Sequence, residues 1–149
     1  IGTLDGANIE IREAVGAENF FLFGLEAHEV PGVRQSYDPG RIIADDPDLN
    51  AVMKMLESDY FSRHESGIFA PIIASIRDPG DQWLTAADFR SYVNAQQCSG
   101  ELFRRPHEWT RMSLLNTASS GFFSSDRTIE SYASEIWQVQ PSGGGANIS

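Results

Sequence analysis

The sequence has one cysteine, one lysine and three histidines among its 149 residues, and its apolar runs are short. Because Cys98 is the single thiol, the chain can form no internal disulfide, which fits a reducing compartment and predicts a cytoplasmic protein. No signal peptide is recognisable at Ile1, and no apolar run reaches the roughly 18 residues that a membrane-spanning helix needs. The sequence therefore predicts a protein without a membrane span.

Positive charge is also scarce. The chain has 11 Lys and Arg against 21 Asp and Glu, so its formal net charge is −10. A nucleic-acid-binding protein needs clustered cations, and so does a protein that docks on an anionic membrane surface. We therefore expect neither nucleic acid nor a membrane as a partner.

Common signatures of catalytic and metal sites are missing. His28, His64 and His107 are not spaced i, i+4, and there is no cysteine pair, so no metal site is predicted. The segment Gly2–Gly6 (GTLDG) matches neither G-x-G-x-x-G nor a P-loop, and no G-x-S-x-G elbow is present. Sequence motifs alone therefore assign no catalytic residue.

The N-terminal 24 residues have the pattern of a βαβ unit. Residues 1–4 are short and extended, and residues 9–15 form an amphipathic helix that Asn8 can cap and Gly16 ends. The continuous apolar run Phe20–Gly24 (FFLFG) is typical of a parallel strand buried on both faces. We therefore predict an α/β protein in which residues 1–24 are βαβ, 25–141 are helical and the glycine-rich 142–149 are disordered.

A glycine turn between a strand and a helix marks the carboxyl end of the strand, where clefts of α/β sheets lie. The candidate cleft-lining residues are Gly2, Thr3, Asp5, Gly6 and Asn8. The alternative interpretation is that the glycines only serve the geometry of the turn.

The C-terminal stretch Glu108–Trp137 predicts two helices separated near Gly121. Ser124, Ser125 and Asp126 are alternative caps for the second helix. Its apolar residues are spaced i, i+3, i+4, i+7, i+8 and are Ile129, Tyr132, Ala133, Ile136 and Trp137. This pattern predicts a helical hairpin whose aromatic stripe docks on another surface.

Both ends of the chain also carry a family resemblance. The motifs EWTRM, SSDRTI, YA and EIW between residues 108 and 137, and IGTLDGANIEI and ENFFLFG between residues 1 and 24, resemble the α-glucan (glycogen, starch or maltodextrin) phosphorylases. The resemblance covers about residues 1–141. It implies the C-terminal part of a Rossmann-like domain of the two-domain glycosyltransferase B type, followed by a mostly helical tail.

The resemblance further implies a function for a longer parent protein. Such enzymes use inorganic phosphate and a pyridoxal phosphate cofactor to release α-glucose 1-phosphate from α-1,4-glucans. Implied partners are the α-glucan, inorganic phosphate and the N-terminal domain of the same protein, and members of the family are often homodimers. Since Ile1 lies inside a predicted strand, we expect the chain to be a segment of a longer polypeptide.

The cofactor lysine of that family lies upstream of the point that matches Ile1. Lys54, in the segment AVMKMLES, does not match it, so no cofactor-binding role is assigned to Lys54 and the isolated chain is expected to be inactive. Two alternatives stay open. The chain could be a non-catalytic binding or regulatory module derived from a phosphorylase, or a fragment of another glycosyltransferase with the same fold that uses a nucleotide sugar.

Overall fold

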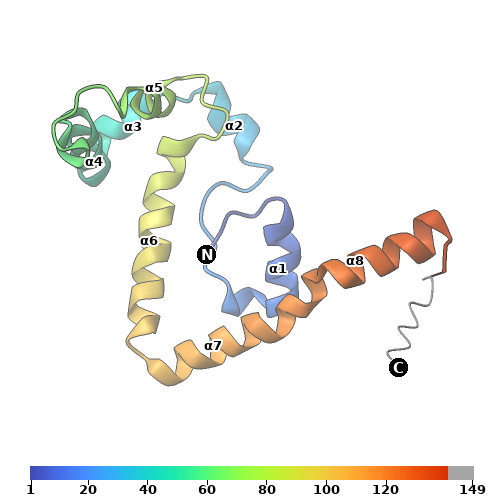
Figure 1. The fold of residues 1–149 in the computed structure, drawn as a ribbon. Coiled ribbons are helices and arrows are strands. Elements are labelled where there is room, and N and C mark those ends of the chain that lie inside the picture. The colour runs from blue at the N-terminus through green and yellow to red at the C-terminus, as the bar shows by residue number, and fades with distance from the viewer. Residues whose placement is uncertain (141–149) are drawn as a thin grey trace.

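The computed structural model describes residues 1–140, and the predicted disordered segment 142–149 lies outside them. Within residues 1–140 the regular structure is helical, and the helices run along an open, bent path (Figure 1). The α-helices are α1 (Ala7–Val15), α2 (Val30–Gln35), α3 (Pro39–Asp45), α4 (Pro47–Glu57), α5 (Ala70–Arg77), α6 (Thr85–Phe103), α7 (Pro106–Ser119) and α8 (Ser125–Ser131). Shorter turns of other helix types are η1 (Ala17–Asn19), η2 (Tyr60–Ser62), η3 (Ser120–Phe123) and η4 (Tyr132–Trp137), the last of which is a π-helix.

The prediction of an α/β, Rossmann-like fold is wrong for this chain. The two predicted strands, 1–4 and 20–24, are not formed, and an isolated parallel bridge joins Gly2 to Leu22. In that bridge the Gly2 amide donates to Phe21 O at 3.0 Å, and the Phe23 amide donates to Gly2 O at 3.1 Å. Two short extended segments alone do not make a stable sheet. The regular structure of the described residues is therefore helical throughout.

Helix α6, rather than a further strand, pairs with the backbone just beyond the apolar run. The Gly24 amide donates to Ser91 Oγ at 2.9 Å, and the Leu25 amide donates to Asp88 Oδ1 at 3.1 Å. The Phe23 ring meets the Tyr92 ring edge to face, with 5.2 Å between centroids. A helix side chain thus satisfies the Gly24 amide, which the sequence pattern assigned to a strand.

The hydrophobic core lies where α3 and α4 pack on the start of α6. Its buried members are Tyr37, Ile43, Leu49, Met53, Leu84 and Ala86. Met53 is the central side chain, since it is only 1% exposed. Burying a side chain of this size contributes roughly 1.5–3 kcal/mol to folding.

The start of α4 has a capping aspartate and a proline in its first turn. Asp46 Oδ1 accepts hydrogen bonds from the amides of Asp48 and Leu49, both at 3.0 Å, and Pro47 occupies the first turn. Arg90 of α6 donates through Nε to Asp46 Oδ2 at 2.8 Å. The side-chain hydrogen bond from Arg90 holds the pKa of Asp46 below its usual value. The cap of α4 therefore also ties α4 to α6.

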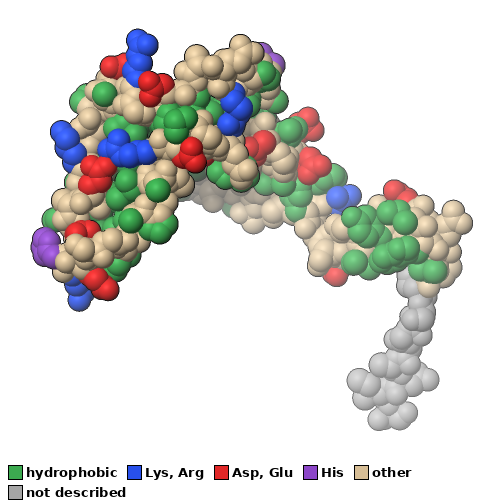
Figure 2. All heavy atoms as spheres, turned by 90° about the horizontal axis from the view of Figure 1, so that it is seen from above, with side chains coloured by type: hydrophobic (Ala, Val, Ile, Leu, Met, Phe, Trp, Pro, Cys, Tyr) green, Lys and Arg blue, Asp and Glu red, His purple; other side chains and the backbone are tan. Residues whose placement is uncertain are grey.

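The C-terminal arm, which we define as residues 120–139, leads away from the rest of the molecule beyond α7 (Figure 1). Among the alternative caps of α8, the structure selects Ser124, whose Oγ accepts from the Arg127 amide at 3.2 Å. Hydrophobic side chains gather on the arm in Figure 2. The exposed ones are Phe122, Phe123, Ile129, Tyr132, Ile136, Trp137 and Val139.

No helix within residues 1–140 is long and apolar enough to cross a membrane.

Candidate functional site

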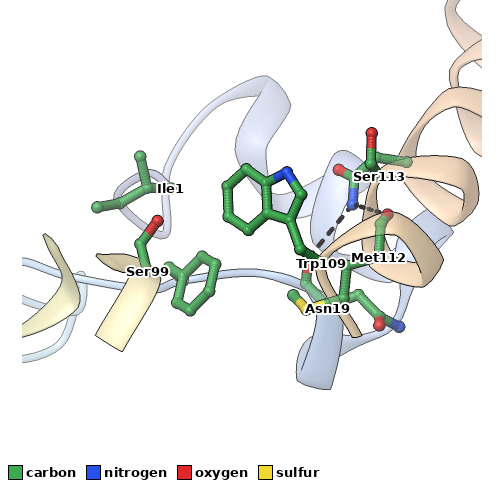
Figure 3. Close-up of a pocket in the computed structure, with 8 residues that line it drawn as sticks. Ile1, Asn19, Ser99, Trp109, Met112 and Ser113 are labelled. Atoms are coloured by element: carbon green, nitrogen blue, oxygen red, sulfur yellow. Dashed lines mark hydrogen bonds between the residues drawn. The ribbon is translucent and has the colours of Figure 1, made fainter. Parts of the chain in front are cut away.

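A pocket of about 250 Å³ lies between the N-terminal segment, η1, α6 and α7 (Figure 3). It is lined by Ile1, Asn19, Phe21, Ser99, Trp109, Met112, Ser113 and Asn116. Trp109 packs edge to face on Phe103, with 5.1 Å between ring centroids. Asn116 Nδ2 donates to Met112 O at 3.0 Å and to Asn19 O at 3.4 Å, so α7 is joined to η1 at the pocket wall.

Asn19 is the buried polar group of this pocket. Its Nδ2 donates to Val15 O at 2.8 Å, which ties η1 to the end of α1. Its Oδ1 has no hydrogen-bond partner among the described residues. A buried acceptor without a donor typically costs about 1–3 kcal/mol, so this wall favours a donor from outside the described residues.

A second hollow, of about 130 Å³, lies between the N-terminal segment and the loop that precedes α6. It is lined by Thr3, Asp5, Leu25, Val30, Gln82, Trp83, Leu84 and Asp88. Two of the predicted cleft residues, Thr3 and Asp5, therefore meet residues that are about 80 positions away in the sequence.

Asp81 organises the loop before α6. Its Oδ1 accepts from the Trp83 amide at 2.9 Å, and its Oδ2 accepts from the Thr85 amide at 2.8 Å. Burial pushes the pKa of Asp81 upward, but the hydrogen bonds from Thr85 and Trp83 outweigh that effect, so the pKa lies below its usual value. The carboxylate form of Asp81 is thus the form that fits the loop.

Arg34 of α2 fixes the same loop from the other side. Its Nη1 donates to Asp81 O at 3.0 Å, and its Nη2 donates to Gln82 O at 2.6 Å. These contacts hold the backbone of Leu84 in the left-handed region at φ 54°. The Leu84 side chain is packed in the core and is 2% exposed. Such a conformation costs a non-glycine residue of order 1–3 kcal/mol, and it persists because the surrounding contacts determine it.

Asp88 is the less exposed carboxylate of the second hollow. Burial raises its pKa above the usual value, and the nearby charges of Asp5 and Asp81 act in the same direction, whereas the hydrogen bond from the Leu25 amide opposes them. Three carboxylates thus share one side of the molecule, and the residues that line the hollow include no cation. A neutral ligand with several hydroxyl groups suits these surroundings better than an anion does.

The five predicted cleft residues do not form one cluster. Thr3 and Asp5 line the second hollow. Gly2 is buried, and a Cβ atom at Gly2 would lie 2.8 Å from Asn8 Nδ2, so a larger residue would require the Asn8 side chain to move. Gly6 is exposed and provides the N-cap position of α1 at φ 47°, which means that Asn8 lies inside the helix and is not its cap.

Sequence reasoning missed the polar and aromatic residues that α6 and its preceding loop bring to the hollow, namely Gln82, Trp83 and Asp88. The segment DQWLTAAD contains Thr85, which can cap a helix, but the structure places Thr85 inside α6 and Leu84 at its N-cap position. The available signal was Asp81, because an Asp three or four residues before a helix can bond the first free amides. Nothing in the pattern indicates that Thr3 and Asp5 lie beside this segment.

Groups of three or more metal-ligating side chains were not found within residues 1–140. The residues present also do not fit pyridoxal phosphate. Lys54, the one lysine of the sequence, lies on the exposed side of α4 and lines neither of the two pockets described above. A Schiff-base lysine needs a site that encloses the cofactor, so this chain by itself holds no such site.

Comparison with known proteins defines the class. A family model described as carbohydrate phosphorylase matches residues 1–139, so the chain belongs to the carbohydrate phosphorylase family. The chain is 46% identical over 142 residues to a glycogen phosphorylase of Synechocystis sp., an alignment that covers 95% of the chain and 17% of that relative. It is 42% identical over 139 residues to a glycogen phosphorylase of Chlamydia pneumoniae, covering 93% of the chain and 17% of the relative.

A plant relative gives the same result. The chain is 44% identical over 146 residues to the chloroplastic/amyloplastic α-1,4 glucan phosphorylase L isozyme of Ipomoea batatas, covering 95% of the chain and 15% of the relative. The chain therefore spans about a sixth of the length of the curated relatives that it matches.

Proposed function

We propose that this chain is the C-terminal portion of an α-1,4-glucan phosphorylase, which we call the parent enzyme. The parent enzyme would use inorganic phosphate to release α-glucose 1-phosphate from glycogen or maltodextrin. The observation that carries the proposal is the match to the carbohydrate phosphorylase family along residues 1–139. Relatives that are 41–46% identical and are named glycogen or α-glucan phosphorylases support the choice of substrate.

The catalytic lysine of the parent enzyme would lie outside this chain. When bound, pyridoxal phosphate would supply a phosphate group that exchanges protons with inorganic phosphate. Because Lys54 lies on the exposed side of α4, the contribution of this chain would be to form walls of the cleft and not to attach the cofactor. The isolated 149 residues are therefore expected to be inactive.

The C-terminal arm would pack against the N-terminal domain of the same polypeptide. Its exposed Ile129, Tyr132 and Trp137 form an apolar face that no other described residue covers. A second copy of the parent enzyme is a further partner in this proposal. The proposed location is the cytoplasm, which fits a chain with a single cysteine. Hydrogen exchange of α8 tests the docking: its amides should exchange slowly in the full-length polypeptide and quickly in the 149-residue chain.

The decisive experiment is phosphorolysis by the full-length natural polypeptide. We expect α-glucose 1-phosphate to appear when the polypeptide receives maltoheptaose, inorganic phosphate and pyridoxal phosphate, and not when phosphate is left out. The 149-residue chain, under the same conditions, should form no product. Product formation by the 149-residue chain would contradict the inactivity of the segment.

Two further measurements separate the alternative functions. Sugar transfer from a nucleotide sugar in place of phosphate would favour another glycosyltransferase. A natural polypeptide with a mass near 16.5 kDa, which is the mass of this chain, would favour a binding or regulatory module. We expect a mass several-fold larger and no transfer from nucleotide sugars.

A further inference from the structure

Trp83 is the most exposed of the large hydrophobic side chains within residues 1–140. Its side chain is 74% exposed, whereas its neighbour Leu84 is 2% exposed. The two consecutive residues thus point in opposite directions, one into the core and the other into solvent. An exposed indole presents a flat apolar face together with one N–H donor, so a ligand that has both an apolar face and polar groups can bind to it.

The loop holds Trp83 in this position through contacts on both of its sides. Asp81 accepts from the Trp83 amide and from the Thr85 amide, and Arg34 donates to the carbonyl groups of Asp81 and Gln82. Leu84 keeps a left-handed backbone although it is a leucine. Strained backbone of this kind gathers at sites of function, because the strain is retained where a particular geometry is needed. The indole is therefore presented by a rigid frame, which lowers the entropy cost of binding to it.

Trp83 lines the second hollow together with polar residues. Thr3 supplies a hydroxyl, Asp5 an exposed carboxylate and Gln82 an exposed amide. Sugar hydroxyl groups donate to carboxylates and amide oxygens, and the C–H face of a pyranose ring packs on an aromatic ring. The hollow also lacks a lining cation, so it does not suit inorganic phosphate.

We infer that Trp83, together with Thr3, Asp5 and Gln82, forms a subsite for the α-glucan chain, in which the indole stacks on a glucose ring. This inference rests on the proposed function, since it assigns part of the substrate site of the parent enzyme. Asp5 and Gln82 orient the sugar through its hydroxyl groups, and Trp83 supplies the apolar contact. Trp83 is a binding residue here and takes no part in the chemical step.

The test uses the full-length polypeptide with Trp83→Ala, Trp83→Phe and, as a matched control, Tyr60→Ala. Tyr60 is similarly exposed but lies in η2, outside the hollow. Glucan binding is measured as retardation in native gels that contain glycogen, a readout that needs no catalysis. Phosphorolysis then gives KM for maltoheptaose and KM for phosphate separately.

For Trp83→Ala we expect glucan affinity to fall and KM for maltoheptaose to rise by about fivefold to tenfold, with KM for phosphate and kcat within about twofold of wild type. Trp83→Phe should recover most of the affinity because it keeps an aromatic face. Tyr60→Ala should behave as wild type. Asp5→Asn should weaken glucan binding less than Trp83→Ala does.

Unchanged glucan affinity in Trp83→Ala overturns the inference. If its melting temperature falls at the same time, Trp83 is instead covered by another part of the parent enzyme. An equal rise of KM for glucan and for phosphate also overturns it, because the effect is then not specific to the sugar. If glucan retardation depends on Trp83 but the polypeptide shows no phosphorolysis, the subsite stands and the proposed function is contradicted. If the polypeptide carries out phosphorolysis that does not depend on Trp83, the proposed function stands and the subsite is contradicted.

Discussion

The core of α3, α4 and α6 and the C-terminal arm contain the same kinds of apolar residue but use them differently. In the core, Ile43, Leu49 and Met53 are buried against one another. In the arm, Ile129, Ile136 and Trp137 follow an equally regular helical spacing and remain exposed. An amphipathic pattern therefore tells which face of a helix is apolar, and it does not tell whether the partner lies within the same stretch of chain.

The first prediction concerns Met53, where we expect the largest effect. Met53→Ala should lower the free energy of opening of α4 by about 2–5 kcal/mol, because it removes a buried side chain and leaves a cavity. Met55→Ala is the matched control, since Met55 lies on the same helix and is exposed, and its effect should stay within about 0.5 kcal/mol. Amide hydrogen exchange of α4 in the full-length polypeptide measures both. Equal decreases in the free energy of opening of α4 in the two variants would contradict the assignment of Met53 to the core and Met55 to the surface.

The second prediction concerns the pH dependence of the loop before α6. The folded pKa of Asp81 lies below its value of 3.8 in an unfolded chain. Its contribution to stability is therefore complete above pH 3.8 and is lost as the pH falls through the lower folded pKa. Protection of the Thr85 amide, corrected for intrinsic exchange rates, should fall in that acidic range.

Asp81→Asn is the control for this pH dependence. It should lower the protection of the Thr85 amide at neutral pH, because a neutral amide oxygen is a weaker acceptor than a carboxylate. The decrease in acid should then be absent. A variant that keeps the acid transition of the wild type would show that another group titrates.

The third prediction concerns the contact between Arg90 and the cap of α4. Arg90→Met should lower the free energy of opening of α4 much less than Met53→Ala does, since the Arg90 side chain is 45% exposed and water screens its ion pairs with Asp46 and Asp48. The effect should decrease further in 1 M salt, where charges are screened within about 3 Å. Hydrogen exchange of α4 at low and high salt measures it. A loss as large as that of Met53→Ala would mean that the ion pair, and not the apolar core, dominates this region.

The smallest effect on the core is expected from the arm. Ile136→Ser and Trp137→Ser in the 149-residue chain should leave the free energy of opening of α4, measured by hydrogen exchange, unchanged within about 0.5 kcal/mol, because both side chains are exposed.

The unmodified 149-residue chain should bind a hydrophobic dye and aggregate, and these two variants should bind less of the dye. Absence of dye binding by the unmodified chain would contradict the view that the arm lacks its partner.

Several helix starts can be explained from local sequence alone. Pro47 and the acidic residues at the start of α4, Pro71 in the first turn of α5, and the caps considered for α8 all follow from local chemistry. It failed for the run Phe20–Gly24, because a continuous apolar run looks the same whether a strand or a helix covers it. The neighbouring backbone, at Gly24 and Leu25, donates to Ser91 and Asp88, which lie more than 60 residues away.

The candidate site shows the same division. Thr3 and Asp5 were predicted because a glycine turn between a strand and a helix marks the carboxyl end of the strand, where clefts of α/β sheets lie. Trp83 and Asp88 were not, because their proximity depends on how α6 packs beside the N-terminal segment. Local sequence carries no record of that packing.

The sequence by itself determined the family, through motifs near both ends, and the start and apolar face of α8, through capping residues and spacing. Tertiary structure alone decided that the extended segments form a single bridge and that an indole stands exposed beside Asp5. Capping and periodicity act within a few residues, so they are written in the local sequence. The environment of Phe20–Gly24 and of Trp83 is set by contacts between distant segments, which only the folded chain brings together.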